Sequence, residues 1–363
     1  MSEPTQAPGS MDGLNGANGA LALELKGVVK RYGAKTALVG LDLKVPRGSI
    51  FGLVGANGAG KTTTFSIISG FLSSDEGTVD LLGEGPFEAS RHRGRVTILP
   101  QDSALGRDMP VAEQLFYFAR LQGLSRKEAR ESVSHILKVV DLESRARERV
   151  RMLSHGMMRR MGIAQCFLGS PELVLLDEPT NGLDPRQANQ IRAFIAAGRG
   201  ARTVVVSSHN LNEIEHLCDH IALIDQGRVV RSGTVAEITG RQGEIRIGLG
   251  EGPASASGLV QVLQQGLPRQ LTLGSGAPSG ASGLEDNRSL ALASPVMLQG
   301  ALQVQWHLET RTMVIRFSPQ EGAEAEDIIN AALTLLLQNG ARIASVSRGQ
   351  SLERTFLEST HTS

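Results

Sequence analysis

The stretch that most constrains the fold of this chain is GANGAGKTTT, which occupies residues 55 to 64. The residues before it, SIFGLVG, form a short apolar run that is typical of a buried strand. The residues that follow its lysine, TTTFSIISGFL, carry apolar side chains at helical spacing. The sequence therefore predicts a strand, a tight glycine-rich loop and a helix in direct succession.

The residue types of this loop indicate phosphate binding. Gly55, Gly58 and Gly60 let successive backbone N–H groups point inward, at the positive end of the helix that follows. We expect Lys61 to reach the outer phosphates as a point charge and the Thr62 hydroxyl to ligate magnesium. The spacing G-x-x-x-x-G-K-[ST] is that of the phosphate loop of nucleotide triphosphatases. The similar stretch GLNGANGA has neither a lysine nor a preceding strand, so we interpret it as a linker.

Composition argues against several other classes of function. Lysine plus arginine and aspartate plus glutamate both number 37 among 363 residues, so no net charge attracts the chain to nucleic acid or to an anionic membrane. Residues 1–20 lack the basic and apolar blocks of a signal peptide, and we expect a flexible tail there. No apolar run approaches the ~18 residues that a membrane span requires. Cys166 and Cys218 lie in stretches of helical character, which favours a reducing compartment without disulfides.

Apolar patterning predicts a first domain over residues 21–240. Residues of about 102–169 have helical periodicity, and strand-like stretches lie on both sides of them. This order predicts an α/β fold with a parallel-rich core sheet, antiparallel strands and a helical subdomain. The strand-like stretches are LALELKGVVKRYG, KTALVGLDLKVPRG, GTVDLLG, RVTILPQD, ELVLLDEP, RTVVVSSH and HIALIDQGRVV, the last with a hairpin turn at Gln226 and Gly227.

The chain changes character after about residue 240. The stretches GEGPASASG and GSGAPSGASG predict a flexible region over about 249–300. Beyond it, ALQVQWHLE, TMVIRFS, the helical AEDIINAALTLLLQNG and ARIASVSRG predict a compact β-β-α-β unit. We therefore expect residues 241–363 to form a smaller α+β accessory domain.

Two further strand ends supply residues for phosphate chemistry. In LVLLDEP, Asp177 emerges at the carboxyl end of a buried strand, where ligands bind in sheets of this kind. We expect Asp177 to hold magnesium and Glu178 to take the proton from an attacking water. In VVVSSHN, His209 follows another apolar strand and is placed to contact the γ-phosphate or the water.

The histidine-rich stretch HNLNEIEHLCDH also suggests a metal site. His216, Cys218 and His220 cluster there, with the two histidines four residues apart. The segment reads more simply as an amphipathic helix that runs into the next strand, and it lacks paired metal-ligand spacing. We therefore interpret these three residues as structural.

A second anion-binding feature is LSHGMMRRMGIAQCFL. Ser154 is a good helix N-cap, Gly156 keeps the approach to the helix open, and an amphipathic helix follows. A chain that already has one phosphate loop has no obvious use for another such feature, unless it completes the site of a second copy.

The motifs GANGAGKT, ILPQD, LSHGM, LVLLDEP, NGLD and SSH, in this order, resemble the nucleotide-binding subunit of an ATP-binding cassette (ABC) transporter. The resemblance covers residues of about 22 to 240. It implies that Tyr32 stacks on adenine, that Gln101 senses magnesium and the γ-phosphate, and that Asp184 crosses a dimer interface. It also implies that His209 completes the catalytic geometry.

The resemblance further implies that Ser154 and Gly156 clasp ATP bound to the opposite subunit. The commonest form of that signature is LSGGQ, whereas here His155 and Met157 replace its first glycine and its glutamine. The capping serine and the following glycine survive, so clasping of ATP should survive as well. The implied nucleotide contacts are Tyr32, Gly55, Ala56, Asn57, Gly58, Ala59, Gly60, Lys61, Thr62, Thr63, Ser154, Gly156 and Asp184; the implied magnesium contacts are Thr62, Gln101 and Asp177; the implied catalytic residues are Glu178, His209 and Gln101.

The closing stretch GQSLERTFLEST resembles the tail of exporter ATPases of the drug, polysaccharide and gliding-related type, in which separate chains cross the membrane. This implies a cytoplasmic subunit that is peripheral on the membrane, forms a homodimer or heterodimer of cassettes, and drives a permease subunit. We expect the segment 102–112 and the apolar residues Leu115, Phe116, Phe118 and Leu121 to include the surface that meets the permease.

Other members of the superfamily fit the sequence less well. A ribosome-associated ABC protein would normally carry two phosphate loops, and one is found. A DNA-repair ATPase would separate Lys61 from Asp177 by long heptad arrays, which are absent. The remaining alternative is a soluble ABC ATPase with a regulatory, non-transport role.

Overall fold

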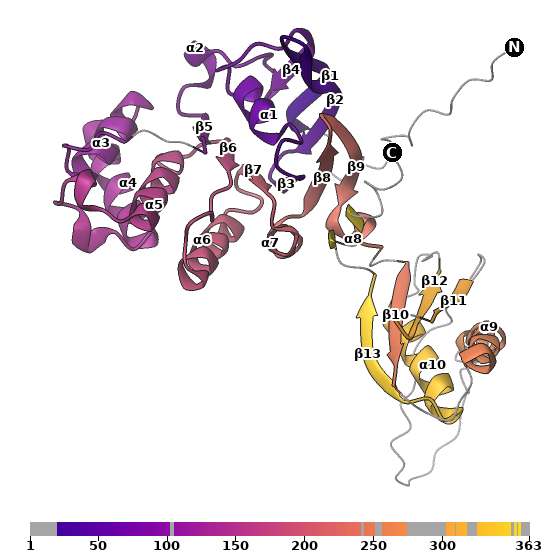
Figure 1. The fold of residues 1–363 in the computed structure, drawn as a ribbon. Coiled ribbons are helices and arrows are strands. Elements are labelled where there is room, and N and C mark those ends of the chain that lie inside the picture. The colour runs from indigo at the N-terminus through magenta and orange to yellow at the C-terminus, as the bar shows by residue number, and fades with distance from the viewer. Residues whose placement is uncertain are drawn as a thin grey trace, which may run out of the picture. The chain divides into compact units, whose positions relative to one another are not determined.

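The computed structural model describes residues 20–101, 105–240, 243–250, 256–273, 303–308, 310–317, 325–349, 352–353 and 355–356. These residues fall into two compact units: the first contains the residues up to Val235 together with Phe356, and the second contains those from Ala236 to Thr355 (Figure 1). The short helix α8 (Val235–Ile238) lies at this division. The two units are described separately below.

A six-stranded sheet forms the centre of the first unit. Its order is β5-β6-β7-β3-β8-β9, with parallel pairing from β5 to β8 and antiparallel pairing between β8 and β9. The strands β3, β6 and β7 are buried along their whole length, as expected for a parallel sheet covered on both faces. The parallel-rich α/β fold predicted from the sequence is confirmed. The strands are β3 (Ile50–Val54), β5 (Val96–Leu99), β6 (Leu173–Asp177), β7 (Thr203–Ser208), β8 (His220–Asp225) and β9 (Arg228–Thr234).

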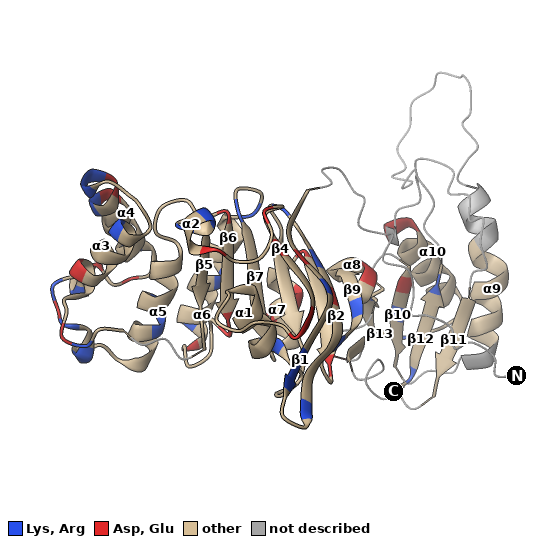
Figure 2. Ribbon diagram, turned by 90° about the horizontal axis from the view of Figure 1, so that it is seen from above, with Lys and Arg blue, Asp and Glu red and all other residues tan. Residues whose placement is uncertain are grey.

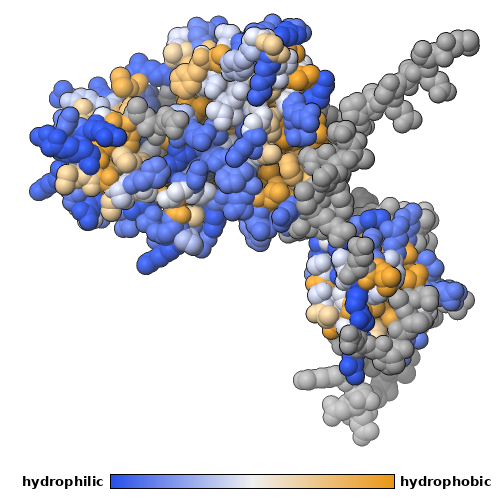
Figure 3. Space-filling view, in the orientation of Figure 1, coloured by the Kyte–Doolittle hydropathy of each residue, from blue (hydrophilic) through white to orange (hydrophobic). Residues whose placement is uncertain are grey.

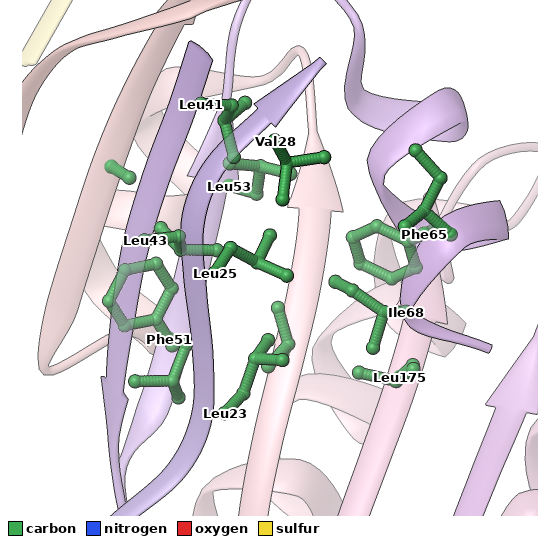
Figure 4. Close-up of a cluster of buried hydrophobic side chains, with 14 of the residues drawn as sticks. Leu23, Leu25, Val28, Leu41, Leu43, Phe51, Leu53, Phe65, Ile68 and Leu175 are labelled. Carbon is green, nitrogen blue, oxygen red and sulfur yellow. The ribbon is translucent and has the colours of Figure 1, made fainter. Parts of the chain in front are cut away.

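A second, antiparallel sheet packs over helix α1 (Lys61–Ile68). Its order is β2-β1-β4, formed by β1 (Leu21–Tyr32), β2 (Lys35–Pro46) and β4 (Glu76–Leu81). Phe65 and Ile68 of α1 lie in one buried cluster with Leu25 of β1 and Leu175 of β6 (Figure 4). Because α1 is packed into this core, the loop at its N-terminus starts from a fixed position.

The predicted hairpin turn in HIALIDQGRVV is also confirmed. Asp225 pairs with Arg228 across the turn, and Gln226 and Gly227 have φ values of 45° and 77°. Two successive residues of positive φ are typical of a tight hairpin whose turn matches the twist of its strands.

The helical subdomain consists mainly of α3 (Val111–Leu121), α4 (Arg126–Val139) and α5 (His155–Cys166), with short 3-10 turns at Glu143–Arg145 and Val150–Met152. Ser125 and Glu128 form a reciprocal capping box at the start of α4. Helical structure begins at Val111, and residues 102–104 lie outside the described residues. Basic and acidic residues are interspersed over α3 and α4, so neither sign of charge dominates this surface (Figure 2).

Three more helices complete the first unit: α2 (Ala89–His92), α6 (Pro185–Ala197) and α7 (Leu211–Leu217). Asp184 caps α6, with Pro185 at its first position, and Asn210 caps α7. Both helices follow strands of the central sheet, so their N-termini lie near the carboxyl ends of β6 and β7.

The second unit is larger than the β-β-α-β arrangement that the sequence predicted. Its antiparallel sheet has the order β11-β12-β10-β13, and its chain order is β-α-β-β-α-β, which is the split βαβ arrangement of ferredoxin-like folds. The elements are β10 (Glu244–Leu249), α9 (Ala256–Leu273), β11 (Gln303–His307), β12 (Thr312–Arg316), α10 (Ala325–Gln338) and β13 (Ile343–Arg348).

The prediction of a flexible region over 249–300 is wrong for its first part, because α9 occupies Ala256–Leu273. The small residues at the start of this stretch obscured an apolar stripe of Leu259, Leu263 and Leu267, which are all buried. Gly266 allows close packing against α10, since a Cβ there would lie 2.9 Å from Leu335 Cδ1. Residues 274–302 lie outside the described residues, as does nearly all of the expected N-terminal tail. None of the helices described is both long enough and apolar enough to cross a membrane.

Candidate functional site

The glycine-rich loop joins β3 directly to α1. Gly58 and Gly60 have φ values of 84° and 114°, which side chains other than glycine rarely adopt. A Cβ on Gly55 would lie 2.3 Å from the carbonyl oxygen of Ile224, and one on Gly60 would lie 2.7 Å from Leu38 Cδ2. Glycine is therefore favoured at 58 by the backbone conformation, at 55 by the neighbouring chain, and at 60 by both.

The hairpin turn between β8 and β9 supports this loop, a role that the sequence did not indicate. The Gly227 N–H donates a 2.9 Å hydrogen bond to the carbonyl of Ala59, and the Gly227 carbonyl accepts a 2.9 Å bond from the Val39 N–H. A Cβ on Gly227 would lie 2.4 Å from the Ala37 carbonyl oxygen. The turn thus links the phosphate loop to β2, and only glycine fits there.

Lys61 lies at the first position of α1 and is almost fully buried. Its Nζ donates to the carbonyl oxygens of Gly55 at 2.8 Å and Ala56 at 3.1 Å, so the side chain curls over its own loop. Burial lowers the pKa of Lys61, and the carboxylates of Glu178 and Asp177 oppose that shift. A cation held at a cost in desolvation is suited to receive an anionic ligand.

Asp177 and Glu178 end β6 beside the loop. The buried Asp177 carboxylate accepts a hydrogen bond from the hydroxyl of Ser207 on the adjacent strand β7. The Glu178 N–H donates to the Ser207 hydroxyl at 3.0 Å and to the Ser207 carbonyl at 3.2 Å. Glu178 has a φ of 49°, which turns its side chain away from the continuing strand direction. Ser207 therefore orients both acidic residues, whereas the sequence analysis assigned a role only to His209 within the SSH motif.

His209 contacts Glu178 directly. Its Nδ1 lies 3.0 Å from Glu178 Oε1 and 3.1 Å from Oε2, and Asn181 Nδ2 lies 3.4 Å from Oε2. Thr180 and Ser208, on either side of this contact, both donate to the carboxylate of Glu213. Since Glu213 belongs to α7, that helix holds the segment after β6 and the segment after β7 together.

An open cavity of about 530 Å³ connects these groups. It is lined by residues of the phosphate loop, by Glu178 and His209, and by Tyr32, which is half exposed. Asp177 and Ala59 are buried and are not among the residues that line the cavity. The predicted site residues that line the cavity are Tyr32, Asn57, Gly58, Gly60, Lys61, Thr62, Thr63, Gln101, Glu178 and His209.

Ser154, Gly156 and Asp184 are not among the residues that line this cavity. Ser154 caps α5, where its hydroxyl accepts a 3.3 Å bond from the Met157 N–H. Asp184 caps α6 by accepting a 2.8 Å bond from the Gln187 N–H. These residues therefore form a separate surface.

The exposed His155 belongs to that surface and lies against Gly182. A Cβ on Gly182 would be 2.9 Å from His155 Cδ2. The glycine at 182 therefore leaves room for the imidazole of His155, which stands where the commonest signature has glycine. Gly156 lies close to the start of α6, because a Cβ there would be 3.2 Å from Gln187 Oε1. The two capped helix ends thus adjoin each other within one chain.

Comparison with known proteins identifies the family of this chain. A family model described as "ABC transporter" matches residues 38–181. The Nod factor export ATP-binding protein I of Ralstonia nicotianae is 39% identical over 221 residues, covering 60% of this chain and 68% of the relative. The chain belongs to the ABC transporter ATP-binding proteins.

Further matches support the same family. The linearmycin resistance ATP-binding protein LnrL of Bacillus subtilis is 36% identical over 224 residues, covering 61% of this chain and 72% of that protein. A solved structure of an ATP-binding subunit of an ABC transporter superposes with a TM-score of 0.56 at 28% identity, covering 60% of this chain and 91% of that one. This ABC protein is accordingly an ATP-binding subunit that hydrolyses ATP to power transport.

Proposed function

We propose that this ABC protein drives export through a separate membrane-spanning permease, by closing and opening as an ATP-dependent dimer of cassettes. The observation that carries the proposal is the separation of two surfaces: a cavity with the phosphate loop, Glu178 and His209, and a second surface around Ser154 that does not line it. Two of the relatives are named for Nod factor export and for linearmycin resistance, which supports export as the direction of transport.

Within the cavity, Lys61 and the backbone of the loop bind the phosphates of ATP, while Tyr32 supports the adenine at the cavity edge. Thr62, Asp177 and Gln101 are the residues that would hold magnesium, which supplies charge neutralisation at the phosphates when bound. Their oxygen atoms are the ligands that this ion prefers. The buried Asp177, oriented by Ser207, fits that role.

Glu178 acts as the base that takes a proton from the attacking water, and His209 orients it. The 3.0 Å contact between His209 Nδ1 and Glu178 Oε1 supports this arrangement. A base is effective only when it is held within hydrogen-bond reach of its proton, and the contacts from His209 and Asn181 fix the carboxylate.

Ser154 and Gly156 would bind the ATP of a second cassette. The N-terminus of α5 carries a positive partial charge and is exposed, so an anion from another molecule has access to it. Two cassettes related by a two-fold axis would each complete the site of the other.

Mixing two inactive variants tests this composite site. Lys61→Ala and Ser154→Arg proteins should each hydrolyse ATP poorly, whereas an equal mixture should recover about a quarter of the wild-type rate, because half of the dimers would carry one of two intact sites. As a control, Lys61→Ala mixed with the double variant Lys61→Ala/Ser154→Arg leaves no intact site and should stay inactive. A mixture of the single variants as inactive as this control would contradict the composite site.

The permease would dock on the helical subdomain. A groove of about 570 Å³ lies beside α3 and α4 there, and the visible face of this subdomain combines hydrophilic residues with smaller hydrophobic areas (Figure 3). Leu115 is buried in the subdomain and Leu121 is exposed, so the apolar residues predicted to meet the permease are divided between the two environments. The groove is lined by Ala112, Glu113, Phe116, Arg130, Val133, Ser134, Leu137, Glu143 and Ala146.

Gln101 lines the cavity that contains the phosphate loop, and residues 105–110 lead into α3 beside this groove. Arg107 is exposed in that segment, and its carbonyl accepts a 3.0 Å bond from the Arg151 N–H. We expect a movement of Gln101 on ATP binding to act on residues 105–110 and, through them, on the docking surface.

Charge reversal in this segment tests the docking surface. Arg107→Glu should reduce membrane association or transport-coupled ATPase activity several-fold and leave the ATPase activity of the isolated chain within about twofold, because an exposed rim charge acts on association. Arg231→Glu on β9, also exposed, is the matched control and should change neither. Crosslinks from the membrane partner that map only beyond residue 240 would contradict this surface, and the absence of any copurifying membrane chain would favour a soluble regulatory ATPase.

A further inference from the structure

Arg159 occupies the centre of a hydrogen-bond cluster that no sequence motif predicted. It lies in α5, five residues after Ser154, and is only 7% exposed. Its Nη1 donates to the carbonyl oxygens of Pro100 at 3.3 Å and Gln101 at 3.1 Å. Its Nη2 donates to the carbonyl oxygens of Asp177 and Glu178, the second at 2.9 Å. One guanidinium thus holds the main chain at four positions.

The four carbonyls belong to the ends of two neighbouring strands. Residues 100 and 101 follow β5, while 177 ends β6 and 178 follows it, and β5 and β6 pair in parallel. The first end leads into the segment before α3, and the second carries the two acidic residues of the site. Arg159 therefore joins the main chain of Gln101 to the main chain of Glu178 through helix α5.

The neighbouring Arg160 shows that this arrangement is not a general property of buried arginines in α5. Arg160 is 3% exposed, but its Nη1 donates to the carbonyls of Val140 at 2.6 Å and Asp141 at 3.0 Å, within the helical subdomain. The two arginines have the same helix, side chain and degree of burial. They differ in whether their acceptors belong to the site.

We propose that Arg159 is a positioning residue that links the surface around Ser154, where the ATP of the partner cassette binds, to Gln101 and Glu178 of its own chain. This inference rests on the proposed function. Ser154 and Arg159 are separated by about 7.5 Å along a rigid helix. When the partner's nucleotide draws the start of α5 toward it, the guanidinium moves the two strand ends as one unit. Gln101 and Glu178 then keep their positions relative to each other.

The planar fork of arginine is required for this role. Two donor nitrogens serve two pairs of carbonyls at once, whereas the single ammonium of lysine is a point charge on a flexible stem. The four carbonyl oxygens that Arg159 contacts lie at the ends of β5 and β6, outside the phosphate loop. Loss of Arg159 should therefore lower the rate of hydrolysis and leave the affinity for ATP nearly unchanged. Arg159→Lys should therefore preserve the buried charge and lose the link.

Three variants of the full chain test the inference. Arg159→Lys and Arg159→Met should lower kcat for ATP hydrolysis by about 10-fold to 100-fold and change the Kd for ATP less than about threefold, because positioning acts on the reacting geometry. Arg160→Met is the matched control, and it should lower the thermal midpoint while its folded fraction retains near wild-type kcat. Thermal unfolding, nucleotide binding and steady-state ATPase activity would be measured on each.

A double-mutant cycle separates positioning from general stability. If Arg159 acts through Gln101, the loss in kcat for Arg159→Lys combined with Gln101→Ala should be smaller than the product of the single losses. The inference would be overturned if the Arg159 and Arg160 variants lost kcat equally, in proportion to their loss of stability. It would also be overturned if the effects of Arg159→Lys and Gln101→Ala on kcat were fully multiplicative. Normal hydrolysis by Glu178→Gln would instead overturn the proposed function on which it rests.

Discussion

Replacing Glu178 by glutamine is expected to slow ATP hydrolysis by about two to four orders of magnitude, which is the usual contribution of a general base. The amide is nearly isosteric with the carboxylate, but it accepts no proton from water at neutral pH. Lys61 and the loop backbone are untouched, so ATP should still bind. Steady-state ATPase activity and equilibrium nucleotide binding would establish both parts of this result.

The same variant should accumulate as an ATP-bound dimer. A ligand that binds the closed state and is not turned over shifts the equilibrium toward that state. Light scattering with magnesium and ATP should report twice the monomer mass for Glu178→Gln, and a wild-type sample should return to monomer as ATP is consumed. Monomer alone, both for the isolated chain and for the membrane complex, would refute the two-cassette model.

Glu172→Gln is the control for this experiment. Glu172 lies just before β6, at the opposite end of the strand from Glu178, and its carboxylate pairs with Arg95 at 2.5 Å and Arg47 at 3.6 Å. The substitution changes the same functional group at the other end of the same strand, away from the cavity. It should leave kcat near the wild-type value, and if Glu178→Gln also does so, the base lies elsewhere.

Removal of the Lys61 charge is expected to abolish ATP binding at micromolar nucleotide. A hydrogen bond to a charged group contributes about 1.5–3 kcal/mol, so losing the contacts to two phosphates weakens binding by a factor of about 100 or more. Lys61→Met retains most of the buried stem and should show the same loss as Lys61→Ala. Nucleotide affinity at wild-type level in Lys61→Met would remove the basis for the phosphate-loop assignment.

The stability of these variants provides a second measurement. Because burial lowers the pKa of Lys61 in the folded nucleotide-free protein, its charged form is disfavoured by folding. This cost in folding free energy is fully present at pH values below the pKa of Lys61 in the folded protein. It decreases as the pH rises from that value toward the ordinary pKa of lysine. The free energy of unfolding of the wild-type protein should show that rise relative to Lys61→Met, and equal pH profiles would contradict the buried charge.

Local sequence was sufficient to predict the elements that carry the site. The run before residue 55 and the helical spacing after Lys61 predicted β3 and α1, and the pair Gln226 and Gly227 predicted the hairpin turn, because the information lies within a few adjacent residues. The same holds for Asp177 and Glu178, whose place at a strand end follows from the four apolar residues before them. The resemblance to ABC proteins added roles for Tyr32 and Gln101, which stay predictions.

Helix α9 shows where local patterning failed. Its apolar stripe of Leu259, Leu263 and Leu267 has helical spacing, but the neighbouring glycine, serine and alanine residues lowered the contrast on which that pattern depends. The stripe becomes buried only when the chain folds and β10 and α10 pack against it. As a result, the sequence predicted the last four elements of the β-α-β-β-α-β unit and missed its first strand and helix.

The sequence by itself determined which residues of the first unit form strands, loop and helix and in which order the motifs occur. Only the tertiary structure decided which distant groups orient them: Ser207 against Asp177, Gly227 under Ala59, and Arg159 across the ends of β5 and β6. These contacts join residues that are far apart in the sequence, from 18 residues for Arg159 and Asp177 to 168 residues for Ala59 and Gly227. A serine, a glycine or an arginine has no periodicity of its own, so its hydrogen-bond partners are defined only when packing brings those segments together.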